Sequence, residues 1–320
     1  MTLTGPLPPA LTRPGSRRPA VIRTVLAILG LPVVVALAEA ATFYEENRDN
    51  GTIISSGEKR TYLLYVPRSY DRARPTPLVI SLHGAALWGA AQKEISQWNR
   101  VAEREGFIVV YPSGAGGNGP RVWHANGGPG PSKDVRFISD LIDTLSAGYN
   151  IDATRIYANG LSNGGGMSFV LSCTMSDRIA AVGMVGAAHL LPWSWCTDHR
   201  PVPMIAFHGT ADRAAPYNGG VSWVATERFP SIPTWTSTWA QRNRCAPTPV
   251  DSAVAVDVTR RAYSNCADDA AVVLYTIRGG GHTWPGGGPL AEWFVGRTTN
   301  SIDASSLMWA FFRAHPLAAK

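Results

Sequence analysis

The sequence predicts an α/β fold, in which a mostly parallel sheet carries helices on both faces within a single domain. Apolar, strand-like runs alternate with amphipathic segments along the chain, which is typical of that class. Hydrophobic residues make up 45% of the chain, enough for a large core, and charged residues make up only 16%. A length of 320 residues allows two domains, but α/β folds of this size are often one.

The first 40 residues have the pattern of an export signal. Four arginines precede an apolar run over residues 25–38, and small residues near 38–40 mark the expected cleavage site. The run is interrupted by Gly30 and Pro32 and is too short for a membrane span of ~20 residues. We therefore expect a signal at 1–40 and a secreted domain at 41–320, with an uncleaved N-terminal anchor as the alternative.

Strand and helix signals alternate through the domain. Strands are predicted where β-rich apolar runs lead into loops, at residues 76–82, 152–158, 202–208 and 271–277. Helices are predicted where apolar residues recur at helical spacing, at residues 135–149, 167–171 and 301–312. Asp134 or Ser132 is the candidate N-cap of the first of these helices.

The most informative motif is Gly160-x-Ser162-x-Gly164, between the strand at 152–158 and the helix at 167–171. This spacing, in a strand–turn–helix context, is that of a nucleophile elbow, which lifts a serine hydroxyl above a sheet. Glycines suit a turn that leaves no room for Cβ atoms. An ordinary small residue in a turn is the less favoured interpretation of Ser162.

A serine nucleophile needs a base and a group that orients the base. Asp212 and His282 each stand on a loop just past a predicted strand, and they follow Ser162 in the order serine, acid, histidine. Catalytic groups collect at that edge of open α/β sheets. A turn-capping Asp212 and a non-catalytic loop His282 are the competing interpretations, and His208 is expected to be structural.

The same mechanism needs two backbone amides that stabilise an oxyanion. One is expected from Asn163, the residue after the nucleophile, and its place at a helix start favours this role. The other is expected from Ala85, with Ala86 as the alternative, because the strand at 76–82 runs into His83-Gly84 and these small residues.

Several segments carry a resemblance to a known family, in its order: residues 60–67, 78–84, 106–114, 134–138, 160–165, 208–212 and 279–287. The chain resembles the extracellular esterases of the polyhydroxybutyrate depolymerase-like and feruloyl esterase-like group. The resemblance implies an α/β-hydrolase fold and a secreted serine esterase with the triad Ser162, Asp212 and His282. The chain departs from many relatives at Trp123-His124, where they have Trp-Asn-Asp, so substrate choice does not transfer.

Four cysteines fit a protein of an oxidising compartment and allow three pairings. We favour Cys173–Cys196 and Cys245–Cys266, which would join neighbouring segments, and the family resemblance implies the same pairs. Free buried thiols are the alternative.

Neither the net charge nor the spacing of cysteines and histidines indicates a nucleic-acid partner or a metal. The chain has 29 basic and 23 acidic residues, or +6, but four arginines precede Glu39, so 25 against 23, or +2, remain beyond them. A nucleic-acid partner is therefore not expected. No Cys/His spacing indicates a metal, so we expect no cofactor, and no stable membrane association once the signal is removed.

Tryptophans gather around the predicted acid and base, at positions 193, 195, 223, 235, 239 and 284. Rigid aromatic surface near a catalytic edge can stack on sugar or aryl rings, but packing in the core is the favoured interpretation for most of them. Trp284 is the expected exception because it lies two residues from the base. Trp123 is a second candidate substrate contact, because its loop is expected to border the acyl pocket.

The sequence thus predicts a secreted serine esterase that works through an acyl-enzyme. Feruloyl or acetyl esters of polysaccharide, or hydroxyalkanoate oligomers, are the expected substrates. The alternatives are a cell-envelope acyltransferase with the same triad, a serine peptidase, and a non-catalytic binding protein on the same scaffold.

Overall fold

The computed structural model describes residues 48–318, apart from 116–119, 126–130, 189–190, 199 and 224–227. The expected export signal at 1–40 therefore lies outside the described residues. Within the described ranges, no helix is long and apolar enough to cross a membrane.

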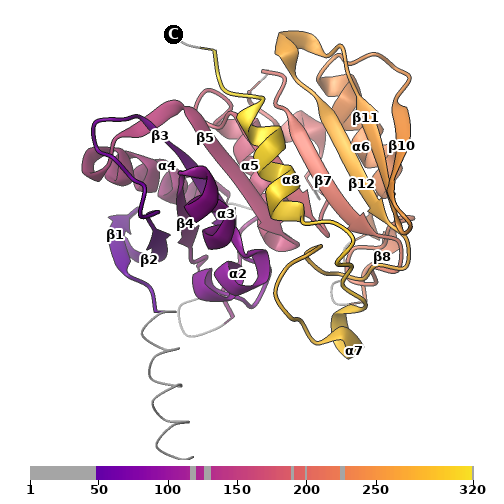
Figure 1. Ribbon diagram of the computed structural model, residues 1–320, viewed down its shortest axis with the longest axis horizontal. Helices are drawn as coiled ribbons and strands as arrows, with labels where there is room; N and C mark the ends of the chain where they lie inside the picture. Colours follow the sequence, from indigo (N-terminus) through magenta and orange to yellow (C-terminus); the bar gives the residue numbers. More distant parts are fainter. Residues whose placement is uncertain are drawn as a thin grey trace, which may run out of the picture. The chain divides into compact units, whose positions relative to one another are not determined.

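A ten-stranded sheet forms the centre of the domain (Figure 1). In chain order its strands are β1 (Gly51–Ser55), β2 (Glu58–Tyr65), β3 (Thr76–Leu82), β4 (Ile108–Pro112), β5 (Ile151–Leu161), β6 (Ala181–Val185), β7 (Met204–Gly209), β10 (Val250–Ala255), β11 (Val258–Tyr263) and β12 (Val272–Ile277). They lie in the order β1-β2-β4-β3-β5-β6-β7-β12-β11-β10. The strands from β4 to β12 in this order are parallel, and the two strands at each edge are antiparallel.

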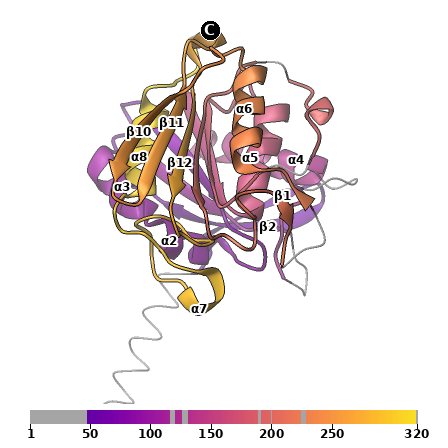
Figure 2. The ribbon, with the colours of Figure 1, turned by 90° about the vertical axis from the view of Figure 1, so that its right-hand side faces the viewer.

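Helices cover both faces of the sheet, as predicted (Figure 2). One face packs against α4 (Pro131–Gly148), α5 (Asn163–Thr174) and α6 (Ile232–Arg242), and the other against α2 (Gly89–Ser96), α3 (Trp98–Glu105) and α8 (Ala304–Arg313). Alternate residues of β3 serve the two faces, since Leu78 and Ile80 join the first core and Val79 joins the second. A strand buried on both sides must be apolar throughout, which explains the uninterrupted run in the sequence.

Three predicted helix starts are corrected, and the first is that of α5, which begins at Asn163 and not at 167. The helix expected from 135 begins at Pro131, so neither Ser132 nor Asp134 is its N-cap. Proline is well suited to a first helical turn, because its missing N–H would have no partner there. The closing helix begins at Ala304 and not at 301, because the Asp303 carboxylate caps it by accepting the Ser306 N–H at 3.0 Å.

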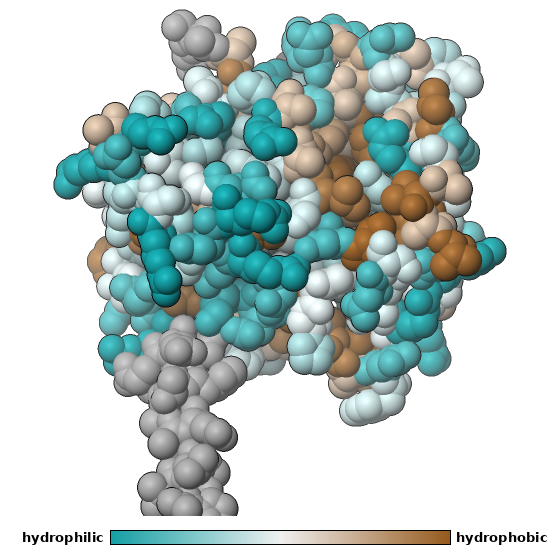
Figure 3. Space-filling view, in the orientation of Figure 1, coloured by the Kyte–Doolittle hydropathy of each residue, from teal (hydrophilic) through white to brown (hydrophobic). Residues whose placement is uncertain are grey.

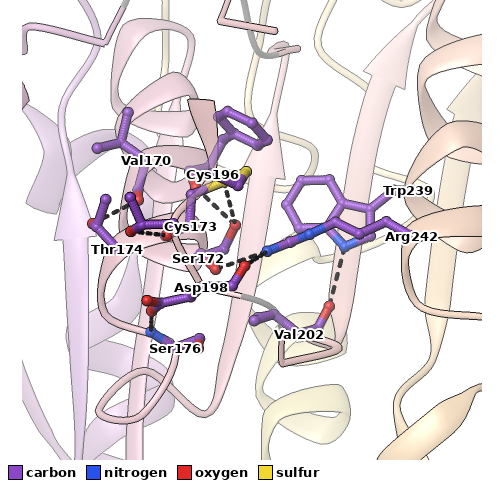
Figure 4. The surroundings of a disulfide bond; sticks show 12 residues. Val170, Ser172, Cys173, Thr174, Ser176, Cys196, Asp198, Val202, Trp239 and Arg242 are labelled. Atoms are coloured by element: carbon purple, nitrogen blue, oxygen red, sulfur yellow. Dashed lines mark hydrogen bonds between the residues drawn. A yellow bond between two sulfur atoms is a disulfide. The ribbon is translucent and has the colours of Figure 1, made fainter. Parts of the chain in front are cut away.

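The two expected disulfides are present, Cys173–Cys196 and Cys245–Cys266. Figure 4 shows the first, which joins the end of α5 to the loop after the short 3-10 helix η1 (Trp193–Trp195). Beside it the Arg242 guanidinium donates to the carbonyl of Ser172 at 3.2 Å, and the Asp198 carboxylate accepts the Ser176 N–H at 2.6 Å. Helix α5, which follows Ser162, is thus fixed at its far end.

The sheet ends in an edge strand that carries exposed valines. Figure 3 shows hydrophobic side chains gathered on the right, where β10 to β12 lie, and the exposed valines of β10 and its turn are Val250, Val254 and Val256. A register shift between Ala253 and Ala255 marks an irregularity in the β10–β11 pairing. Such bulges make an edge a poorer template for pairing with another chain.

Candidate active site

The Gly160-x-Ser162-x-Gly164 motif forms a sharp turn between β5 and α5. Ser162 has φ 53° and ψ −120°, a strained conformation that an L-residue seldom adopts outside functional sites. A Cβ on Gly160 would lie 2.3 Å from the Gly164 carbonyl carbon, and a Cβ on Gly164 would lie 2.3 Å from the Leu82 oxygen. Gly160 is therefore required for the turn itself, and Gly164 for the turn to pack against the end of β3.

Asp212 and His282 meet because they follow neighbouring parallel strands, β7 and β12. His282 Nδ1 lies 2.8 Å from Asp212 Oδ2, and the other carboxylate oxygen accepts the N–H groups of Ala214 and Ala215 at 2.9 and 2.8 Å. The Asp212 side chain is fully buried, whereas that of His282 is 12% exposed. With its Nδ1 proton donated to Asp212, His282 presents Nε2 as a base.

A second histidine, His208, lies against the acid. Its Nε2 is 2.7 Å from the Ala215 oxygen and 3.3 Å from Asp212 Oδ2, and its buried Nδ1 has no partner among the described residues. Burial alone would raise the pKa of Asp212, but the facing His282 and hydrogen bonds from His208 and His282 outweigh burial and hold this pKa below its usual range. The carboxylate is thereby kept ionised.

Ser162 adjoins the Asp212–His282 pair across the end of β6. The Ser162 N–H donates to the carbonyl of Val185 at 2.9 Å, and the next residue, Gly186, lies against the histidine ring. A Cβ on Gly186 would be 3.0 Å from His282 Nδ1 and 3.4 Å from Asp212 Oδ2. Among the described residues Ser162 Oγ has no hydrogen-bond partner, so the structure brings the serine beside the Asp212–His282 pair without a hydrogen bond between serine and histidine.

The loop after β3 lies beside the nucleophile. A Cβ on Gly84 would be 3.6 Å from Ser162 Cβ. The Ala86 N–H already donates to the Arg121 oxygen at 2.9 Å, whereas the N–H groups of Ala85 and Asn163 meet no acceptor in the described part of the chain. An oxyanion site needs donors without another acceptor, so Ala85 and Asn163 stay the predicted pair.

His83, to which the sequence assigned no role, fixes this loop. It is fully buried; its Nε2 accepts the Gly114 N–H at 2.8 Å, and its Nδ1 therefore carries the proton and donates to the Gly84 oxygen at 2.7 Å. Burial lowers the pKa of His83 to about 4, so the ring is neutral at pH 7. Its position directly after β3 and before glycine is the only sequence signal for this role.

The two tryptophans expected to contact substrate are buried, so this expectation is corrected. Trp123 and Trp284 are each 1% exposed. The Trp123 indole donates to the His83 oxygen at 3.0 Å, and the Trp284 indole donates to Ser305 Oγ at 3.0 Å. Their large rings stabilise the core beneath the site instead of facing its surface.

The Asn163 side chain connects the elbow to the loop that carries Trp123. Its Oδ1 accepts the Trp123 N–H at 2.7 Å, and its Nδ2 donates to the Trp123 carbonyl at 2.9 Å.

Known proteins resemble this chain in sequence. The family model described as Esterase PHB depolymerase matches residues 60–191. Feruloyl esterase B of Piromyces equi is 31% identical over 230 residues, and a bifunctional acetylxylan esterase/xylanase of Neocallimastix patriciarum is 34% identical over 161 residues. The matches cover 70% and 50% of this chain but only 42% and 22% of those two relatives, so the chain corresponds to one part of each.

A solved structure shows the same fold. The acetyl xylan esterase from Aspergillus awamori superposes with a TM-score of 0.57 at 16% identity, over 82% of this chain and 98% of the other. The mostly parallel sheet, the helices on both faces and this likeness confirm the predicted α/β-hydrolase fold. Together the sequence and structural matches confirm that the chain is similar to the polyhydroxybutyrate depolymerase-like and feruloyl esterase-like α/β-hydrolases.

Proposed function

We propose that the domain is a carboxylic ester hydrolase that uses Ser162, His282 and Asp212. The observation that carries the proposal is the buried 2.8 Å contact between His282 Nδ1 and Asp212 Oδ2, beside a serine held in a strained elbow. The sequence relatives, named as feruloyl and acetylxylan esterases, support esters over amides.

In the proposed reaction Ser162 Oγ attacks the ester carbonyl while His282 Nε2 takes the serine proton. The tetrahedral oxyanion accepts hydrogen bonds from the Ala85 and Asn163 amides. His282 then gives the proton to the alcohol oxygen as the carbon–oxygen bond breaks, which leaves a Ser162 ester. Water, deprotonated by His282, attacks this acyl-enzyme and releases the acid, and the proton returns to Ser162.

In the proposed mechanism, the oxyanion site and the Asp212–His282 pair supply the catalysis. An oxyanion donor contributes ~3 kcal/mol to lowering the barrier, and here the His83 contacts hold the Ala85 loop in place without a charged side chain. Asp212 keeps the correct tautomer of His282 and stabilises the imidazolium that forms.

The proposed substrates are feruloyl or acetyl esters of polysaccharide, or hydroxyalkanoate oligomers. Support comes from the names of the relatives, which include both feruloyl and acetylxylan esterases, and from the family model that describes polyhydroxybutyrate depolymerases. We also propose that the protein is exported, because its two disulfides are typical of oxidising compartments.

The test compares the parent protein with Ser162→Ala on p-nitrophenyl acetate, and labels both with a fluorophosphonate that is located by mass spectrometry. We expect the variant to lose roughly 10⁴-fold or more in kcat and to lose the label. Ser69→Ala, at an exposed serine, is the matched control and keeps both. Label on another residue, or full activity of Ser162→Ala, would overturn the proposal.

The same preparation separates the related reactions. Faster cleavage of a peptide amide than of its matched ester would indicate a peptidase. Formation of a new ester from an added alcohol, with little free acid, would indicate an acyltransferase.

A further inference from the structure

An exposed group of aromatic side chains stands apart from the buried tryptophans. We name Trp223, Trp293 and Phe294 the aromatic rim; their side chains are 45%, 89% and 48% exposed. Trp223 and Phe294 have ring centroids 5.0 Å apart, and Trp293 and Phe294 have centroids 5.7 Å apart. Residues that are distant in sequence thus form one surface.

The aromatic rim is joined to the candidate acid and base through the main chain. Trp293 and Phe294 belong to the short helix α7 (Glu292–Val295), whose last residue accepts the His282 N–H at 2.6 Å. The Trp223 N–H donates to the carbonyl of Arg213 at 3.3 Å, and Arg213 directly follows Asp212. Figures 1 and 2 show α7 at the end of the sheet where the parallel strands finish.

The aromatic rim does not contribute to the hydrophobic core. Helix α7 contains no buried residue, whereas Trp235 and Trp239, which lie between the same acid and base in sequence, are 1% and 0% exposed. Leaving large aromatic rings in water forgoes the free energy of burying them, and grouped exposed apolar side chains are typical of binding surfaces.

The proposed reaction indicates which part of a substrate lies next to the aromatic rim. The ester oxygen that leaves must face His282, because the histidine protonates it, and the carbonyl oxygen must face the Ala85 and Asn163 amides. Main-chain hydrogen bonds join the rim to the loops of His282 and Asp212, and among the described residues none joins it to the loop of Ala85. These links to the loops of the acid and the base favour the side of the leaving alcohol for the rim.

We propose that the aromatic rim binds the polysaccharide chain that carries the ester, a proposal that rests on the proposed esterase function. The apolar C–H face of a sugar ring packs against an aromatic face, and rings in series suit a chain that extends beyond the scissile bond. The Arg213 guanidinium, centred 5.3 Å from the Trp223 ring, offers hydrogen-bond donors to sugar hydroxyls beside that face.

The first test measures binding without turnover. Ser162→Ala protein is run by affinity electrophoresis through gels that contain soluble, deacetylated xylan, with and without Trp293→Ala or Trp223→Ala. We expect retardation of Ser162→Ala, and a roughly 2- to 10-fold weaker affinity when either ring is removed, the range of a single aromatic contact. Ile54→Ala is the matched control, since Ile54 is 69% exposed on β1 at the edge of the sheet.

The second test uses the active protein. The ratio of kcat/KM for acetylated xylan to kcat/KM for p-nitrophenyl acetate should fall roughly 5-fold in Trp293→Ala and stay constant in Ile54→Ala. Equal losses on both substrates would overturn the proposal. A raised KM for methyl ferulate with an unchanged KM for acetylated xylan would overturn it too, because the rim would then hold the acyl group.

The two proposals fail separately. If the parent binds xylan through the rim but hydrolyses no ester, the esterase proposal fails, and the rim remains a polysaccharide-binding surface. If the parent hydrolyses esters but the rim variants leave xylan binding and the substrate ratio unchanged, the rim proposal fails alone. A shift of Trp293→Ala to a smaller species on gel filtration, with unaltered xylan binding, would identify the rim as a contact between copies of this chain.

Discussion

At the scale of single residues, Gly186 sets the spacing between the candidate catalytic groups. It follows β6, the strand that lies between those preceding Ser162 and Asp212. Its φ of +54° is the left-handed conformation that favours glycine. The missing side chain leaves room for the His282 ring, so the geometry of the base depends on a residue that takes no chemical part.

Gly186→Ala should therefore impair catalysis. The added Cβ would lie 3.0 Å from His282 Nδ1 and 3.4 Å from Asp212 Oδ2, and a displaced base costs up to about 100-fold in rate. We expect kcat/KM for p-nitrophenyl acetate to fall roughly 10- to 100-fold. Gly148→Ala, where nothing lies within 4 Å of the new Cβ, should keep the parent value. Parent-like kinetics of Gly186→Ala would contradict this account of the site.

At the scale of elements, local pattern predicted most of the sheet. The strand expected at 76–82 has those bounds as β3, because a strand covered on both faces is a continuous apolar run bounded by loops. The elbow could be predicted for the same reason, since Gly160 and Gly164 are needed by contacts within one turn and its nearest strand.

Features that depend on packing between distant segments were not predictable. The sequence placed Trp284 at the substrate because it lies two residues from His282, yet the ring turns inward to Ser305 of α8. Likewise nothing local shows that His83 binds the Gly114 amide, because this contact joins two segments that are 31 residues apart in sequence.

Each disulfide joins two segments of the chain. Removing either one should lower the free energy of unfolding and leave the candidate active site in place. They close loops with sequence separations of 23 and 21 residues, for which loop-closure entropy gives roughly 3 kcal/mol each. Cys245→Ser/Cys266→Ser and Cys173→Ser/Cys196→Ser should therefore lower the free energy of unfolding by similar amounts in urea titrations. An unchanged midpoint for either double variant would show that its bridge contributes nothing.

At the scale of the whole molecule, buried neutral and ionised groups set how stability depends on pH. His83 has a folded pKa of about 4 against an ordinary value of 6.5, because burial disfavours its charged form. Between these values the unfolded chain binds a proton that the folded chain does not, so stability falls as pH falls. Asp212 acts in the same direction at lower pH: its folded pKa is depressed, so its contribution is present above its unfolded pKa and lost as pH falls below it.

We therefore expect the free energy of unfolding to fall by about 3 kcal/mol from His83 alone as pH drops from 7 to 4, because the unfolded chain takes up the proton from about pH 6.5 downward and the folded chain only near its pKa of about 4. Urea titrations at several pH values would measure this dependence. His83→Gln is the informative variant, because its amide can accept the Gly114 N–H and donate to the Gly84 oxygen without titrating. Its stability should fall less steeply over the same interval, because burial also lowers the pKa of His315, and that group and Asp212 still titrate in the variant. An equal slope in both proteins would assign the acid sensitivity to other groups and would leave His83 without a part in it.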